Sequence, residues 1–264
     1  MRVVLGIDAA WTTKNPSGFA LALETHAGWK LVAASESYAT FHHLAYSSES
    51  NCPTSLPKAD VLITTAKQLA GYSVTLVAVD MPLAHSPILA RRYSDNEVSR
   101  CYGAKHCSTH SPSAVRPGAI SDNLRKDFTE VGYGLCTQEL RSQALIEVYP
   151  HPALVELADA PRRLEYKAGN MGKYWKDLSA EKRRYKLFKT WQTIENLLEP
   201  EISGVSMSLP KITLSSKVAQ LKAYEDTLDA IICAWVGICA LEGRAIPFGD
   251  SESAIWIPRK APIP

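Results

Sequence analysis

The sequence lacks a long hydrophobic run. No segment approaches the roughly 18 consecutive apolar residues that a membrane-spanning helix needs. The first residues, Met1-Arg2-Val3-Val4, enter a strand-like segment directly, without the basic region, apolar stretch and small-residue cleavage site of a signal peptide. We therefore expect a cytoplasmic protein with no membrane partner.

An excess of charge and a pattern of paired cysteines are also missing. Lysine and arginine total 29 against 27 acidic residues, a formal net charge of +2, which leaves nucleic acid open as a partner because a basic patch can lie on a neutral protein. The six cysteines are scattered, and Cys233 and Cys239 fall in a predicted buried helix. This pattern favours reduced thiols over a disulfide framework.

No internal repeat and no linker divides the chain. Its 264 residues are enough for one large domain, so we expect a single domain over residues 1–264. Between residues 103 and 134, Gly, Pro, Ser and His interrupt every regular pattern, which predicts a loop-rich insertion. Long loops of this kind are often functional. A homo-oligomer is compatible with the sequence, but no pattern indicates one.

Apolar runs predict an α/β fold with a mixed sheet. Strands are expected over residues 3–7, 18–23 and 30–35, which short turns would join into an antiparallel meander. Further strands are expected over 75–79 and 145–149, an edge strand over 254–257, and a loop over 38–57. Helices are expected over 59–70, 87–101, 179–198 and 216–241. Because helices separate the later strands, we expect 75–79 and 145–149 to be parallel, in a five-stranded sheet covered on both faces, to which 254–257 would be an addition at the edge.

Acidic residues stand at the ends of apolar stretches. Asp8, Asp80 and Glu147 each follow such a stretch, and Asp226 and Asp229 open another. A buried carboxylate is costly without a positive partner, and converging carboxylates raise each other's pKa. A divalent metal removes this conflict, and two-metal nucleases use such clusters to cut phosphodiesters.

Five segments in this order resemble the ribonuclease H-like superfamily. They are Gly6-Ile7-Asp8-Ala9-Ala10-Trp11, Asn15-Pro16-Ser17-Gly18, Val79-Asp80-Met81-Pro82-Leu83, Glu147-Val148-Tyr149-Pro150-His151-Pro152 and Asp226-Thr227-Leu228-Asp229-Ala230. More narrowly, the chain looks like a member of the domain-of-unknown-function family 429, described as predicted ribonuclease H-like nucleases. The resemblance covers nearly the whole chain and implies a ribonuclease H-like three-layer α/β/α fold.

The resemblance also implies a metal-dependent nuclease that acts on nucleic acid. It implies that Asp8, Asp80 and Asp229 bind Mg²⁺ or Mn²⁺, with Asp226 as a further candidate and Glu147 as a ligand or a residue that orients water. Holliday-junction resolvases have a similar Asp-x-x-Asp-Ala on their last helix. In this chemistry one ion activates a water and the other stabilises the leaving oxygen.

Several cations and polar residues are candidates for contacts with substrate phosphates. They are Thr12, Lys14, Arg92, Lys167 and Arg183. The alternative for each is an ordinary turn or a solvated helix face. Trp11 is a candidate for stacking on a base, against a simple packing role. A third set, Cys101, His106, Cys107 and His110, lacks the paired spacing of a zinc site, although His110 or His151 could serve as a general acid.

Two other functions remain open at this stage. One is an ATP-dependent kinase or ATPase of the actin and sugar-kinase type, which needs glycine-rich turns around the phosphates. The turns after Asp8 and Asp80 contain no glycine, and Pro82 has no amide hydrogen to donate. The other is a nucleic-acid-binding module without activity, which would have lost one of the acids; none is missing.

Overall fold

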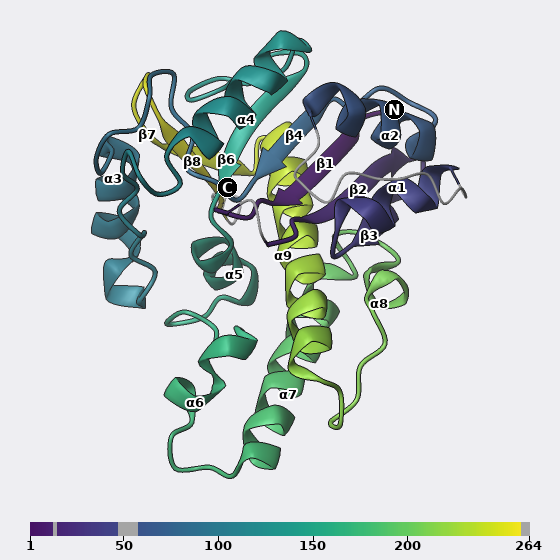
Figure 1. The fold of residues 1–264 in the computed structure, drawn as a ribbon, viewed down its shortest axis with the longest axis vertical. Coiled ribbons are helices and arrows are strands. Elements are labelled where there is room, and N and C mark those ends of the chain that lie inside the picture. The colour runs from purple at the N-terminus through teal and green to yellow at the C-terminus, as the bar shows by residue number, and fades with distance from the viewer. Residues whose placement is uncertain (13–14, 47–57, 260–264) are drawn as a thin grey trace, which may run out of the picture.

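A computed structural model describes residues 1–12, 15–46 and 58–259 and contains one mixed sheet (Figure 1). The strands that form it are β1 (Val3–Asp8), β2 (Gly18–Thr25), β3 (Gly28–Ser35), β4 (Leu76–Val79), β5 (Gly134–Leu135), β6 (Ala144–Val148), β7 (Ala245–Gly249) and β8 (Ala254–Pro258). Their order is β3-β2-β1-β4-β6-β8-β7, with β5 paired to β6.

The directions of the strands agree with the sequence pattern. β1, β2 and β3 form the expected antiparallel meander, and β1, β4, β6 and β8 run parallel. The predicted count of five strands is wrong, because the sheet has eight. β8 is not an edge strand, since β7 pairs with its outer side. β7 contains Pro247, which cannot donate a ladder hydrogen bond and therefore suits an edge position.

Helices cover both faces of the sheet. The α-helices among the described residues are α1 (Tyr38–Tyr46), α2 (Ala59–Ala70), α3 (Tyr93–Tyr102), α4 (Ala119–Glu130), α5 (Pro150–Ala158), α6 (Met171–Tyr174), α7 (Ala180–Leu198), α8 (Val205–Ser208) and α9 (Val218–Leu241). α1, α2 and α4 pack on one face, and α9, with α5 and α7, packs on the other. In Figure 1, α9 begins beside α7, well away from the sheet, and runs up to it.

Two segments predicted as loops contain helices. Residues 38–46 of the expected loop over 38–57 form α1, whose Phe41 stacks on Phe19, and residues 47–57 lie outside the described residues. The expected insertion over 103–134 contains α4, which buries Leu124 and Phe128. In both places a few well-spaced apolar side chains pack on the sheet and stabilise a helix that local composition does not indicate.

The start of α3 was also predicted wrongly. The helix begins at Tyr93, so Arg91 precedes it and Arg92 is its N-cap residue. The Asp95 carboxylate accepts a hydrogen bond of 2.9 Å from the Arg92 backbone N–H, which fixes the first turn. The predicted helix therefore began six residues before its true start at Tyr93.

No helix in the described part of the chain is both long and apolar enough to cross a membrane. The five cysteines that the structure describes are free thiols, as expected, and Cys52 lies outside the described residues.

Two glycines allow α9 to pack against the sheet at backbone distance. A Cβ atom at Gly6 would lie 2.2 Å from the carbonyl oxygen of Ala230, and one at Gly18 would lie 2.3 Å from that of Asp226. No heavier residue fits at either position without moving backbone. Because Gly6 is two residues before Asp8, and Gly18 is paired with Asp8 across β1 and β2, these contacts bring the acids of α9 to the end of β1.

We expect Gly6→Ala to destabilise the protein by about 3 kcal/mol, because the new methyl group collides with helix backbone that has no room to shift. Chemical denaturation measures this change. Gly134→Ala is the matched control, since a Cβ atom there meets nothing within 4 Å. An equal and small effect of the two substitutions would contradict the close-packing account.

Candidate metal centre

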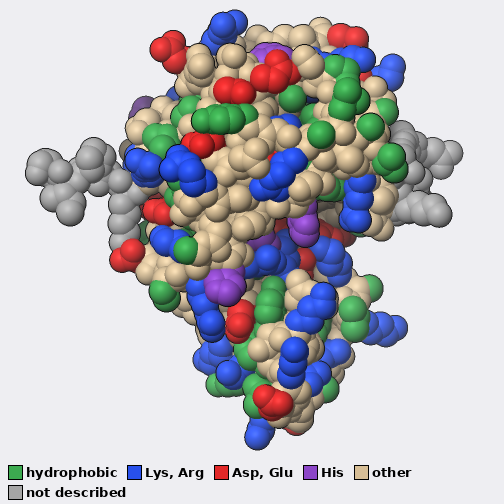
Figure 2. Space-filling view, turned by 90° about the vertical axis from the view of Figure 1, so that its left-hand side faces the viewer, with side chains coloured by type: hydrophobic (Ala, Val, Ile, Leu, Met, Phe, Trp, Pro, Cys, Tyr) green, Lys and Arg blue, Asp and Glu red, His purple; other side chains and the backbone are tan. Residues whose placement is uncertain are grey.

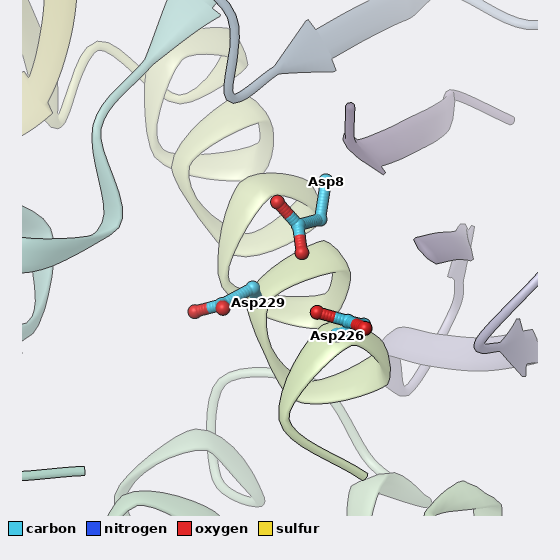
Figure 3. Close-up of side chains that lie close together, drawn as sticks. All are labelled: Asp8, Asp226 and Asp229. Carbon is cyan, nitrogen blue, oxygen red and sulfur yellow. The ribbon is translucent and has the colours of Figure 1, made fainter. Parts of the chain in front are cut away.

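Three aspartates meet where β1 ends against α9. Asp8 is the last residue of β1, and Asp226 and Asp229 lie about one turn apart on α9. One carboxylate oxygen from each lies within 4.8 Å of the others. Figure 3 shows Asp8 reaching from the strand end toward the two helix residues. This acidic trio is the one group of three or more possible metal ligands found in the described residues, and the Cys101, His106, Cys107 and His110 set does not come together in this way.

The sheet register explains which strand-end acids face the trio. Ile7, Val79 and Glu147 lie in one row across β1, β4 and β6, so Asp8 and Asp80 lie in the next row. Side chains in successive rows point to opposite faces. Asp8 and Asp80 therefore point to the face covered by α9, whereas Glu147 starts from the other face. Asp80 lies near the trio but outside it.

Two lysines neutralise part of this acidic charge. Lys222 contacts Asp226 at 2.5 Å and Glu225 at 2.8 Å. Lys167 contacts Asp229 directly and lies 3.6 Å from Glu225. Glu225, which is only 3% exposed, thus lies between both ammonium groups and also accepts the Ala168 backbone N–H at 2.6 Å. The acids near the trio still outnumber these two cations.

The pKa values of the acids reflect their burial and crowding. Burial, followed by the charge of Asp229, raises the pKa of Asp8 well above its usual value. Burial also raises the pKa values of Asp226 and Asp229, against the opposing effect of the lysines. The pKa of Asp80 is raised to about 7, chiefly by burial. A positive charge added among these groups would return them to their ionised forms.

The donor set suits a hard divalent cation. All three ligands are carboxylate oxygens, which Mg²⁺ and Mn²⁺ prefer, and no sulfur or imidazole is among them. Both oxygens of Asp229 already have partners, the Tyr166 hydroxyl at 2.7 Å and the Lys167 ammonium. The residues present therefore fit a metal ion, provided that one contact of Asp229 shifts when the ion is bound.

Two cavities flank the trio. One, of about 210 Å³, is lined by Asp80 together with Tyr166 and Lys167. The other, of about 410 Å³, is lined by Asp8, Asp226 and Lys222. Figure 2 shows a hollow with histidine and basic side chains between the wider upper part of the molecule and the narrower lower part. A ligand could thus reach Asp80 from the first cavity, and Asp8 and Asp226 from the second.

Glu147, which lines the smaller cavity, has several hydrogen-bond partners within the chain. Its carboxylate accepts hydrogen bonds from Arg92 at 2.5 and 2.7 Å and from the Leu83 backbone N–H at 2.7 Å. Arg92 also pairs with Asp95 at 2.9 Å, and all three charged side chains are buried. Burial raises the pKa of Glu147 to about 7, although Arg92 lowers it. The guanidinium of Arg92 therefore binds two carboxylates of its own chain and is not free to contact a phosphate.

The other candidate substrate contacts are scattered. Thr12 is exposed, and Lys14 lies outside the described residues. Arg183 begins α7, as expected, but donates to the backbone oxygens of Trp175 and Lys176 at 2.9 and 2.6 Å. Lys167 lies at the acidic trio. Trp11 packs partly on the core and also lines the smaller cavity.

Three residues of the site were not predicted from the sequence to belong to it. They are Tyr166, Lys222 and Glu225. Lys222 precedes Glu225 by three positions and Asp226 by four, a spacing that puts all three on one side of a helix. This spacing was visible in the sequence. The hydrogen bond from Tyr166 to Asp229 crosses 63 residues and has no local pattern.

Comparison with known proteins gives one match. No curated protein and no solved structure matches the chain. The model of the family described as "Protein of unknown function (DUF429)" matches residues 6–253, which include every acid of the trio and both flanking cavities' charged residues. The match spans nearly the whole chain. The protein therefore belongs to the DUF429 family.

Proposed function

We propose that the protein is a metal-dependent nuclease that hydrolyses phosphodiester bonds of nucleic acid. The observation that carries this proposal is the acidic trio, three buried or half-buried aspartates whose oxygens lie within 4.8 Å of one another. Such a cluster is costly without a cation, and carboxylate clusters that bind Mg²⁺ are typical of enzymes acting on phosphodiesters.

The arrangement of elements supports a ribonuclease H-like assignment. An antiparallel meander leads into parallel strands, with the first strand central in the sheet and a long last helix across it. In our proposal, Asp8 on β1 and Asp226 and Asp229 on α9 take the roles of the superfamily's metal ligands. Asp80 lies beside them as a fourth acid.

Each of the site residues would have its own role in the proposed reaction. Asp8, Asp226 and Asp229 would hold Mg²⁺ or Mn²⁺, which when bound supplies Lewis-acid stabilisation of phosphoryl oxygens and lowers the pKa of water. Tyr166 donates its hydroxyl hydrogen to Asp229 and so orients that carboxylate. Lys167 and Lys222 balance charge around Glu225 and hold the acids in place.

Metal titration tests the proposal. We expect calorimetry to detect binding of Mn²⁺ and Mg²⁺ to the wild-type protein, and a panel of single-stranded, duplex and junction DNA and RNA to reveal metal-dependent cleavage. Asp60→Asn is the control, because Asp60 is an exposed acid on α2, on the opposite face of the sheet. Absence of metal binding at millimolar concentration would refute the proposal.

A further inference from the structure

Aromatic rings form part of the wall of the smaller of the two cavities. Trp11, Tyr149 and Tyr166 line it together with His110 and His151, and Asp80 borders it toward the trio. Its volume of about 210 Å³ is below the roughly 300 Å³ at which pockets for drug-sized ligands begin. It therefore suits one small ring system.

The cations in its wall already have partners. Arg92 pairs with Asp95 and Glu147, and Lys167 contacts Asp229. Neither presents a free positive charge to the cavity, and Asp80 adds an acid. A phosphate would meet this wall without a counter-ion, at a high desolvation cost. The wall instead suits an uncharged ligand.

His151 is buried, and one of its ring nitrogens has no hydrogen-bond partner among the described residues. The residue is 7% exposed, its Nδ1 atom is buried without a hydrogen bond, and its ring packs edge-on against Tyr149 and Tyr166 at 5.4 Å. Burial, with the charges of Lys167 and Arg163, lowers the pKa of His151 well below its usual value. A neutral imidazole carries one donor and one acceptor nitrogen. Buried polar groups normally have partners, so this ring calls for a ligand that supplies them.

We propose that this cavity binds one unstacked nucleobase of the substrate, with its ring against the aromatic wall and its polar edge at His151. A nucleobase is flat, uncharged and rich in donors and acceptors, and bases taken out of the stack are bound by aromatic side chains in this way. The inference rests on the proposed function and narrows it, because only an unpaired or extruded nucleotide can enter the cavity.

The position of the cavity agrees with this assignment. Asp80 and Lys167 line it, and Lys167 contacts Asp229 of the trio. The second cavity lies on the side of Asp8 and Asp226. A base in the first cavity would thus place its own backbone at the acids and leave the second cavity for the adjoining chain.

Binding of a fluorescent oligonucleotide tests the inference separately from cleavage. The probe is a single-stranded octamer with 2-aminopurine at one central position, titrated into the full-length protein in EDTA. We expect a change in 2-aminopurine fluorescence on binding, and an affinity at least about tenfold weaker when that position is abasic. The fully paired duplex of the same octamer should also bind more weakly.

Two substitutions locate the effect. His151→Phe keeps an aromatic ring between Tyr149 and Tyr166 but removes both nitrogens, and we expect it to weaken binding of the octamer about tenfold. His26→Phe is the control and should leave the affinity unchanged, because His26 is exposed in the turn between β2 and β3.

Each outcome has a definite meaning. Equal affinity for the abasic octamer, an unaffected His151→Phe variant, or no binding of the octamer at all would overturn the nucleobase pocket. Cleavage that depends on metal could still be observed then, and the nuclease proposal would stand without it. Base-dependent binding without any metal binding would support the pocket and refute the nuclease proposal instead.

Discussion

Asp8→Asn is expected to abolish metal binding and to lower the rate of metal-dependent cleavage at least about 1,000-fold. The substitution removes one of the three carboxylates of the trio, and a loss of about 4 kcal/mol of transition-state stabilisation corresponds to that factor. The metal-free protein should be as stable as wild type or more stable, since burial and Asp229 already disfavour the charge of Asp8. Calorimetry with Mn²⁺, a cleavage assay and thermal denaturation measure the three effects.

Asp80→Asn serves as the comparison for this variant. Asp80 points to the same face of the sheet but lies outside the trio, so calorimetry should still detect an ion in this protein. Loss of metal binding in both variants would return Asp80 to the ligand set, as the sequence predicts. Clear destabilisation of metal-free Asp8→Asn would instead assign Asp8 a structural hydrogen-bonding role.

Arg92→Met is expected to lower the free energy of unfolding by about 3–5 kcal/mol at pH 8. The substitution leaves Asp95 and Glu147 buried without their shared cation, which is the most costly way to break an ion pair. Urea denaturation measures the loss. Arg100→Met, on the same helix, removes an exposed arginine paired with Glu97 and should leave the stability nearly unchanged.

The cost of Arg92→Met should shrink as the pH falls. The pKa of Glu147 is about 7 in the folded protein, above its ordinary value of 4.5, and removal of Arg92 raises it further. Between pH 7 and pH 4.5 the Glu147 carboxyl of the folded state binds more protons than that of the unfolded state, so lowering the pH stabilises the folded state. We therefore expect the gap between wild type and variant to narrow from pH 8 to pH 5. A constant gap would mean that lost packing, not the unpaired carboxylates, causes the destabilisation.

The sequence predicted the central strands and the long helices because their patterns are local. The residues of β1 to β3 are apolar or alternate between apolar and polar, and clear turns separate them. Both ends of α2 were predicted correctly, and Gly71, which follows it, has a left-handed conformation. Asp8, Asp226 and Asp229 were expected at one site, and the structure brings them together. Their meeting could be predicted from the order of the elements, because the last helix crosses the sheet at the end of β1.

The position and contacts of Glu147 could not be predicted in the same way. Its place at a strand end resembles that of Asp8 and Asp80, but the register places it level with Val79 instead of Asp80. A shift of one residue moves a side chain to the other face of a sheet, and sequence does not show this pairing. The contact of Arg92 with Glu147 joins residues 55 positions apart, and no local sequence pattern indicates it. β5 and α6 were missed because two and four residues are too few for a periodic pattern.

The contact of α9 with β1 at Gly6 and Gly18 has a consequence for the choice of ion. Since main-chain atoms set the separation between strand and helix, the opening among Asp8, Asp226 and Asp229 has a width that the protein cannot freely adjust. Ca²⁺ needs longer bonds and more ligands than Mg²⁺, and flexible loops usually supply them. A ring of carboxylates held by backbone contact lacks that freedom, so the proposed site would favour Mg²⁺ over Ca²⁺ because of how a helix packs on a strand.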